Sequence, residues 1–160
     1  MEYSPPPLGP VDAAFRAPVS HAASKLRGWM RWAVLLAGCL LAVPLAIATQ
    51  LTPSPRGMGT HQQLGLPACS TVQLFGIRCP ACGMTTSWAW AVRGRMLRAV
   101  RANSGGAVLA MIAAVISPWW IGSGLCGRWL GGVPNEKWIL AGAVTVMAVT
   151  VIDWMIRIQT

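Results

Sequence analysis

The chain has 160 residues, of which 54% are hydrophobic and only 11% are charged, and its formal net charge is +9. Soluble domains carry about 25% charged residues, so this composition excludes an ordinary soluble domain. Nine tryptophans against one tyrosine and two phenylalanines favour a membrane protein, because tryptophan prefers the membrane–water interface. The basic residues flank apolar segments. This pattern favours lipid headgroups as their partner, and we expect no nucleic-acid binding.

Four apolar segments follow a proline-rich N-terminal region. Residues 1–28 lack a sustained apolar period, which predicts a disordered tail ahead of a membrane domain over residues 29–160. Three segments, about 32–52, 104–126 and 138–156, are long enough to cross a hydrocarbon core of about 30 Å. Ala46-Ile47-Ala48 resembles a signal-peptidase site. The polar region before it is long for a signal peptide, so we expect a retained helix.

The fourth apolar segment, 79–92, is shorter. A helix of this length rises about 21 Å, which makes it either a short crossing or a re-entrant segment. Four arginines follow, and the last three are spaced for one helix face. We expect these arginines, Arg93, Arg95, Arg98 and Arg101, to face the lipid from a basic amphipathic interfacial helix. The sequence therefore predicts an all-α integral membrane protein with three long helices, one short helix and one interfacial helix.

The distribution of basic residues distinguishes three crossings from four. With three crossings and an inside N-terminus, six basic residues lie inside and seven outside. If residues 79–92 also cross, nine lie inside against three outside, as the positive-inside rule expects. We therefore predict four crossings of a bacterial cytoplasmic membrane. This topology would gather four cysteines at the outer face, where disulfides persist: Cys69, Cys79, Cys82 and Cys126.

The motif Cys79-Pro80-Ala81-Cys82-Gly83 carries the chemistry. Pro80 suits the first turn of a helix, and a helix N-terminus favours a thiolate. A structural disulfide is one use of these thiols, and thiol–disulfide exchange by Cys79 and Cys82 is another. The third use is a zinc-like metal site. Its expected ligands are Cys69, Cys79, Cys82 and Cys126, with His61 as a substitute for the last.

The remaining polar residues offer no hydrolytic machinery. The only histidines are His21 and His61, and the apolar half holds no paired carboxylates, which disfavours a hydrolase. We expect the hydroxyls after the motif to bond to carbonyls one turn earlier, and Asp153 to pair with Arg157. The leading hypothesis is a non-enzymatic accessory component whose cysteine-stapled outer surface docks a membrane or secreted protein. The alternatives are the exchanger and the metal site.

The motif also resembles a known family. The match consists of Cys69, then Phe75-Gly76-Ile77-Arg78-Cys79-Pro80-Ala81-Cys82-Gly83-Met84-Thr85, then Arg93-Gly94 and Ala102-Asn103. These residues resemble the bacterial domain of unknown function 2752 family over about 66–115, with Cys69, Cys79, Pro80, Cys82, Gly83 and Thr85 as the motif positions. Three residues depart from the family pattern, namely Thr86, Arg95 and Ser104. The resemblance implies a small integral membrane protein of unassigned activity.

Overall fold

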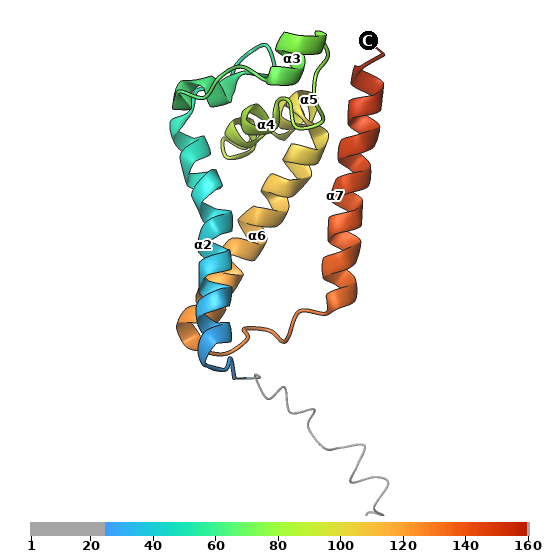
Figure 1. Cartoon of the computed structure of the whole chain (residues 1–160). Coiled ribbons are helices and arrows are strands. Elements are labelled where there is room, and N and C mark those ends of the chain that lie inside the picture. Colours follow the sequence, from blue (N-terminus) through green and yellow to red (C-terminus); the bar gives the residue numbers. More distant parts are fainter. Residues whose placement is uncertain (1–24, 160) are drawn as a thin grey trace, which may run out of the picture.

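The computed structural model describes residues 25–159, and within this range it contains helices and connecting loops without a strand (Figure 1). This architecture confirms the predicted all-α class. The elements are α2 (Gly28–Gln50), the 3-10 helix η1 (Thr60–Leu64), α3 (Ser70–Phe75), α4 (Met84–Ala91), α5 (Met96–Ala102), α6 (Ser104–Cys126) and α7 (Glu136–Arg157).

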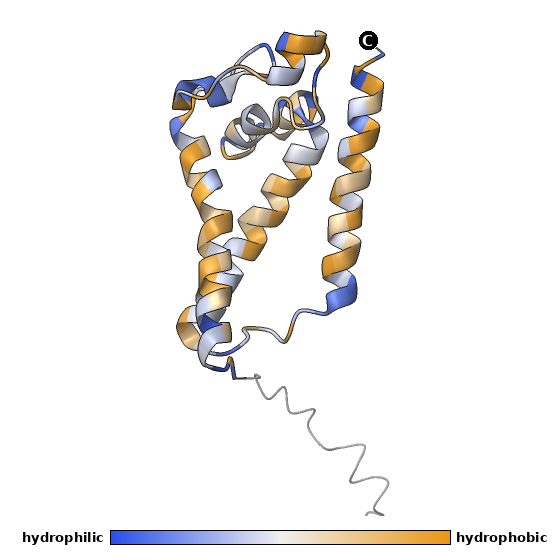
Figure 2. Ribbon diagram, in the orientation of Figure 1, coloured by the Kyte–Doolittle hydropathy of each residue, from blue (hydrophilic) through white to orange (hydrophobic). Residues whose placement is uncertain are grey.

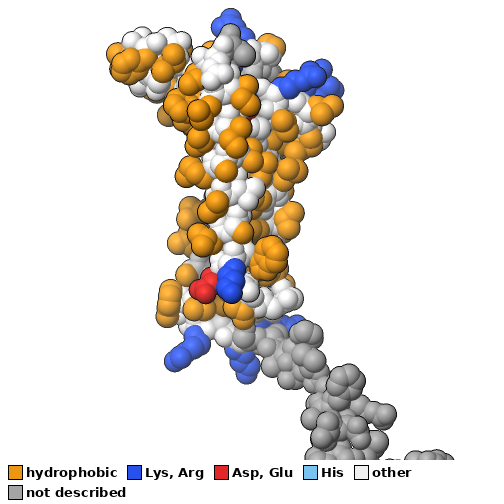
Figure 3. Space-filling model, turned by 90° about the vertical axis from the view of Figure 1, so that its right-hand side faces the viewer, with side chains coloured by type: hydrophobic (Ala, Val, Ile, Leu, Met, Phe, Trp, Pro, Cys, Tyr) orange, Lys and Arg blue, Asp and Glu red, His pale blue; other side chains and the backbone are white. Residues whose placement is uncertain are grey.

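Three helices, α2, α6 and α7, are long and apolar enough to cross a membrane. Their 23, 23 and 22 residues rise about 33–35 Å, enough for a hydrocarbon core of about 30 Å. Hydrophobic residues run along all three helices (Figure 2). The face of the molecule formed by α7 is hydrophobic over most of its length, with charged side chains near its ends (Figure 3). These helices fit a membrane protein.

Helix α6 packs against α2 near one of its ends and against α7 near the other. A Cβ atom on Gly124 would lie 2.9 Å from Leu35 of α2, and one on Gly38 would lie equally close to Ile121. Glycine therefore lets the two backbones approach closely there. At the start of α6, Gly105 takes the same role toward Thr150 of α7. The chain thus runs up α2, down α6 and up α7 (Figure 1).

All the short helices lie at one end of the molecule. We call this the motif end, formed by residues 51–103, the last turn of α2, the first turn of α6 and the last turns of α7 (Figure 1). The opposite end consists of residues 25–27, the first turns of α2 and α7, the last turn of α6 and the loop 127–135. There the backbones of Lys25 and Arg128 form an isolated antiparallel β-bridge, and Leu26 is buried.

The segment 79–92 does not cross the membrane, which corrects the expectation of four crossings. Residues 80–83 form turns, so only the eight residues of α4 are helical. They rise about 12 Å, too little for a crossing. The chain then turns at residues 92–94 and returns as α5 at the same end. Of the two predicted alternatives, the path of this segment matches the re-entrant one, because the segment starts and ends at the same end of the molecule.

Three crossings also remove the charge asymmetry that favoured four. In the described residues, five basic side chains belong to the opposite end, namely Lys25, Arg27, Arg31, Arg128 and Lys137. Seven belong to the motif end: Arg56, Arg78, Arg93, Arg95, Arg98, Arg101 and Arg157. The nine-to-three count was therefore a consequence of the assumed crossing.

Arg93 fastens the motif end to α2. Its guanidinium donates hydrogen bonds to the carbonyl oxygens of Ala48, Thr49 and Leu51 at 2.7–3.2 Å, and to that of Ala89 in α4. The last carbonyls of a helix lack intrahelical donors, so this arginine satisfies the end of α2. The sequence pattern predicted that Arg93 faces the lipid, and it gave no sign of this contact.

The predicted basic helix is α5, and the side that it buries consists of alanines. Ala99 and Ala102 are buried, whereas Leu97 and Val100 are exposed together with the arginines. The guanidinium of Arg98 lies over the ring of Trp90, 4.8 Å from its centroid. That the arginines face lipid stays a prediction. The predicted tail lies outside the described residues up to residue 24, and its last residues, 25–28, are part of the fold.

Candidate functional site

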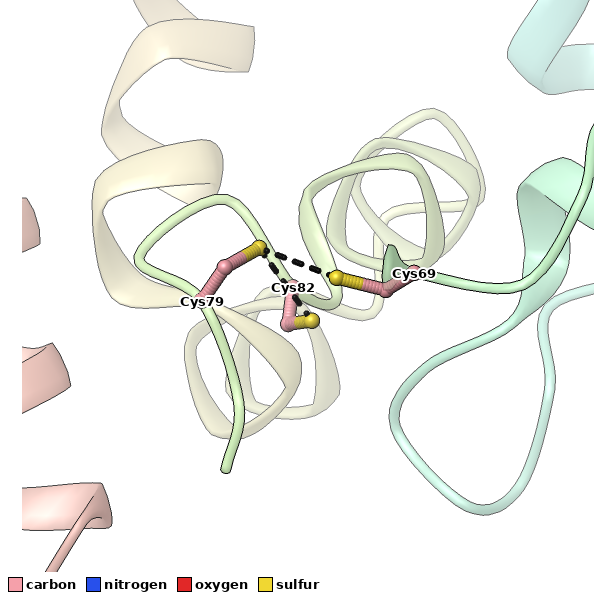
Figure 4. A group of neighbouring side chains, drawn as sticks. All are labelled: Cys69, Cys79 and Cys82. Atoms are coloured by element: carbon pink, nitrogen blue, oxygen red, sulfur yellow. Dashed lines mark hydrogen bonds between the residues drawn. The ribbon is translucent and has the colours of Figure 1, made fainter. Parts of the chain in front are cut away.

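Three cysteines converge at the motif end (Figure 4). The Sγ atoms of Cys69 and Cys79 are 3.5 Å apart, and those of Cys79 and Cys82 are 3.3 Å apart. All three Sγ atoms lie within 4.8 Å of one another. None of the five cysteines forms a disulfide in the structure, so the predicted cysteine staple is not confirmed. What the structure does bring together is a thiol cluster, Cys69, Cys79 and Cys82.

The motif is a turn that precedes a helix. The Cys82 N–H donates to the Cys79 carbonyl at 3.0 Å, and the Met84 N–H donates to the Ala81 carbonyl at 3.1 Å. Helix α4 begins only at Met84, so the prediction that Pro80 occupies the first helical turn was wrong. The turn folds Cys82 back toward Cys79. Cys69 reaches the same point from another segment, where it is the residue preceding α3.

Gly83 ends the turn where three segments meet. Its φ of +88° lies in the left-handed region that suits glycine. A Cβ atom here would come within 2.5 Å of the Gly57 carbonyl oxygen and would also collide with the carbonyl of Ala102. Glycine thus allows the loop before η1 and the end of α5 to pack directly against the cysteine turn.

Asn103 holds the cysteine turn to the start of α6. Its side-chain amide donates to the carbonyls of Pro80 and Cys82, at 3.0 and 3.1 Å. Its Oδ1 accepts from the Gly106 N–H as the N-cap of α6, and the residue is 1% exposed. A buried amide that satisfies three backbone groups fixes their relative positions. Asn103 therefore places the thiols relative to a membrane helix.

Hydroxyl groups of α4 fasten the same region, but not in the predicted way. Thr86 pairs with Thr60 at an Oγ1–Oγ1 distance of 2.7 Å, and Thr60 also accepts from the Ser54 N–H. The Ser87 hydroxyl donates to the Asn103 carbonyl. The hydroxyls of Thr86 and Ser87 thus bond across to other segments instead of to carbonyls one turn earlier. They tie the re-entrant helix to η1 and to α6.

An open pocket lies over the thiol cluster. It measures about 510 Å³, and the three cysteines contribute to its wall. Thr85 of the motif lines it, as does His61, whose Nε2 lies 3.1 Å from the Pro67 carbonyl. The wall also includes Met58, Met84 and Arg56. The thiols are partly exposed and face a space that is large enough for a ligand.

The electrostatics of the cluster distinguish its thiols. A hydrogen bond with the backbone of Val72, followed by bonds with Cys79 and Cys82, lowers the pKa of Cys69 to about 6. Burial, together with bonds to the other two thiols, raises the pKa of Cys82 to about 12. Since the thiolate is the nucleophile and the metal ligand, the lowered pKa makes Cys69 a better nucleophile and ligand than Cys82 at neutral pH.

The other predicted site residues lie elsewhere or act structurally. Cys126 ends α6 at the opposite end and is exposed, so its assignment as a fourth ligand was wrong. The reason is the topology, because α6 carries the chain away from the motif end. Asp153 and Arg157 form the predicted pair at 2.7 Å. Asp153 also accepts from the Ser104 N–H at the start of α6.

Helix α7 reaches the motif through one further contact. The indole N–H of Trp154 donates to the carbonyl of Arg78 at 2.7 Å, directly before Cys79. Together with the Asp153 bond, this contact holds the last turns of α7 against the motif end.

The arrangement of the thiols fits coordination of a metal ion. Ligands of a tetrahedral metal with 2.3 Å metal–sulfur bonds lie about 3.8 Å apart. Two of the Sγ–Sγ distances, 3.5 and 3.3 Å, are slightly shorter than this, and all three Sγ atoms lie within 4.8 Å of one another. Within residues 25–159 they are the one group of three or more Cys, His, Asp or Glu donors at such spacing. Three converging thiolates leave a coordination position open toward the pocket.

Sequence reasoning missed several residues that build the site. Asn103 carried a signal, because asparagine before a helix predicts an N-cap, but its hold on the cysteine turn depends on tertiary structure. Gly57 and Met58 carried none, since they lie in a loop that looks unremarkable apart from its glycines and prolines. Their position becomes visible only when the loop packs on Gly83.

Comparison with known proteins gives a family without an assigned activity. Residues 69–117 match the model of a family described as protein of unknown function (DUF2752). The resemblance stated from the motif is thereby confirmed over the segment that contains the thiol cluster, α4, α5 and the first part of α6. No curated protein and no solved structure matches the chain.

Proposed function

We propose that this membrane protein binds one thiophilic metal ion through Cys69, Cys79 and Cys82. The observation that carries the proposal is the mutual approach of the three Sγ atoms within 4.8 Å. Thiolates coordinate zinc and other soft metals. A site with three protein ligands keeps a position for an exchangeable ligand, and the pocket over the thiols is open.

The scaffold around the thiols supports this proposal. Asn103 fixes the carbonyls of Pro80 and Cys82, and Gly83 allows two other segments to pack against the turn. A metal site needs ligands held by a surrounding shell of hydrogen bonds. Here the shell is built from buried groups, so the turn is already organised when the metal arrives.

The orientation in the membrane is part of the proposal. Lys25, Arg27 and Arg31 stand directly before or within the start of α2, and the first helix usually dominates the orientation. This supports an inside N-terminus, and we propose on that basis that the motif end lies outside a bacterial cytoplasmic membrane. The exposed apolar faces of the long helices then contact lipid. A membrane or secreted protein that docks at the motif end stays a prediction.

Metal stoichiometry tests the proposal. The protein is purified in detergent under reducing, chelator-free conditions, loaded with Co²⁺, with Zn²⁺ or, anaerobically, with Cu(I), and freed of excess metal. We expect one metal per chain and, with Co²⁺, a thiolate-to-metal absorption band. Single serine variants of Cys69, Cys79 and Cys82 should lose bound metal, whereas Cys126→Ser and Cys39→Ser should keep it. A metal-free wild type, or equal loss in Cys126→Ser, would overturn the proposal.

Thiol–disulfide exchange is the second candidate, favoured by the 3.3 Å approach of Cys79 and Cys82. In this reaction a thiolate attacks a substrate disulfide and displaces one substrate thiolate. The neighbouring cysteine then closes an internal disulfide and displaces the other. Two electrons pass to the substrate. The lowered pKa of Cys69 adds a third thiol to the pair predicted from the sequence.

A trapping experiment distinguishes the two candidates. Removal of both neighbouring thiols, by Cys82→Ala in a Cys69→Ala background, should leave a mixed disulfide on Cys79 if the protein exchanges disulfides with a secreted partner. The matched control is Cys126→Ala, whose cysteine lies at the opposite end. Non-reducing electrophoresis of cells that express each variant shows the adduct. Its absence in the double variant, with metal bound by the wild type, leaves the metal site as the function.

A further inference from the structure

Two methionines belong to the wall of the pocket over the thiol cluster. Met58 and Met84 line it together with the three cysteines. Each methionine directly follows one of two glycines that touch, because a Cβ atom on Gly83 would lie 2.5 Å from the carbonyl oxygen of Gly57. The contact that packs the loop on the cysteine turn therefore also brings the two thioether side chains to the wall of the site.

The donors in this wall disfavour hard cations. Of the residues lining the pocket, none is Asp or Glu. Calcium, magnesium and manganese prefer oxygen ligands, and carboxylates above all. Arg56 in the same wall adds positive charge, which opposes a small hard cation but stabilises a site whose thiolates carry excess negative charge.

The set of available donors favours Cu(I) over a structural zinc ion. Structural zinc sites are completed by four Cys, His or carboxylate ligands, and in the described part of the chain only three such donors converge. His61 lines the pocket but does not belong to that group. The remaining soft donors are thioethers, which suit Cu(I). Cu(I) also accepts three sulfur ligands as a complete coordination shell.

We infer that the site selects Cu(I), with the three cysteine thiolates as its main ligands and the thioether of Met58 or Met84 as a further sulfur donor. This inference rests on the proposed function, because it names the metal of the same site. It also gives the pocket a role, since a thioether is neutral and binds weakly enough to be replaced by an incoming ligand.

Packing is the competing role for these methionines. Met84 also lines a second, apolar pocket with Pro44 and Trp88, and it contacts the hydrophobic core. Substitution by leucine preserves volume and is tolerated in most cores. A Met→Leu variant therefore removes the sulfur and largely keeps the packing. Met147, exposed on α7, provides the matched control.

The direct test is X-ray absorption at the copper edge of selenomethionine-labelled protein. The full chain in detergent is reduced, loaded anaerobically with Cu(I) from an acetonitrile complex, and measured as wild type and as Met58→Leu, Met84→Leu and Met147→Leu. We expect about three sulfur scatterers and a selenium scatterer near copper. The selenium signal should disappear in one of the first two variants and persist in Met147→Leu.

Affinity measurements separate this inference from the proposed function. Competition with a chromophoric Cu(I) chelator should show affinity reduced by about 10- to 100-fold in the responsible Met→Leu variant, with Co²⁺ affinity unchanged. Copper bound without a selenium neighbour, or Zn²⁺ and Co²⁺ bound while Cu(I) is not, overturns the inference and leaves the metal site standing. If none of the three metals binds, the proposed function itself fails.

Discussion

The two ends of the molecule use one similar contact but are otherwise held together differently. At the opposite end, Arg31 of α2 donates to the carbonyls of Gly124 and Leu125, which end α6. At the motif end, Arg93 donates to the carbonyls that end α2. Each arginine satisfies backbone groups that a helix end leaves without intrahelical partners. A positive charge near a helix C-terminus also complements the helix dipole.

The difference lies in what surrounds these arginines. At the opposite end two continuous helices pack through glycines, as Gly38 and Gly124 show. At the motif end, short segments are joined by single polar side chains, above all Asn103. Packing of continuous helices distributes stability over many residues, whereas the motif end depends on a few. A region built this way tolerates substitution poorly, but it can position several thiols from different segments.

The largest expected effect follows from Gly83→Ala. Alanine at positive φ costs about 1–2 kcal/mol, and overpacking against backbone adds about 1–3 kcal/mol. Gly65→Ala is the matched control, because Gly65 also has positive φ but no atom lies near its Cβ position. Denaturant unfolding in detergent measures both changes in the free energy of unfolding. An equal cost for the two variants would show that the three segments do not converge at Gly83.

Asn103→Ala should rank second. It removes an N-cap, which costs about 1 kcal/mol, and two hydrogen bonds to partly buried carbonyls, each worth about 0.5–1.5 kcal/mol. Asn135→Ala removes the N-cap of α7, where the Asn135 side chain accepts from the Lys137 N–H. We expect this control to lose about 1 kcal/mol or less. Metal stoichiometry should fall in Asn103→Ala alone, and retention of full stoichiometry there would contradict the assigned role of Asn103.

Arg93→Ala should have a smaller effect that still exceeds that of its neighbours. Hydrogen bonds from a charged donor contribute about 1.5–3 kcal/mol. Arg93 is exposed, so we expect its bonds to α2 to contribute about this much together and not each. Arg98→Ala is the control, because its ring contact with Trp90 is worth about 0.5–1 kcal/mol at an exposed site. Unfolding in detergent compares the two variants. If Arg98→Ala proves the more costly, Arg93 does not fasten the re-entrant segment to α2.

The last prediction changes no residue and leaves stability unaltered. In metal-free, reduced protein, the alkylation rate of Cys69 should rise with pH and level off above its pKa of about 6, because the thiolate reacts. Cys82, with its pKa raised to about 12, should resist alkylation until the medium is strongly alkaline. Mass spectrometry of peptides labelled between pH 5 and 9 reads both sites. In denatured protein the difference should vanish, and its persistence there would assign it to local sequence.

The sequence was sufficient for the features that depend on local composition. The apolar runs predicted α2, α6 and α7, because a bilayer requires about 20 apolar residues per helix. The spacing of Asp153 and Arg157 predicted their pair. The motif predicted the family match. It also required Cys79 and Cys82 to lie near each other, because only two residues separate them.

Only the tertiary structure decided how the short segments are arranged. Residues 79–92 are uncharged, and composition cannot distinguish a short crossing from a return to the same side. The turn at Gly83 and the hydrogen bonds of Arg93 to α2 show that the segment returns to the same end. The same choice removed Cys126 from the cluster and brought Met58 to its pocket. These contacts join residues far apart in the chain, and local pattern determines which helices form but not which loops they hold together.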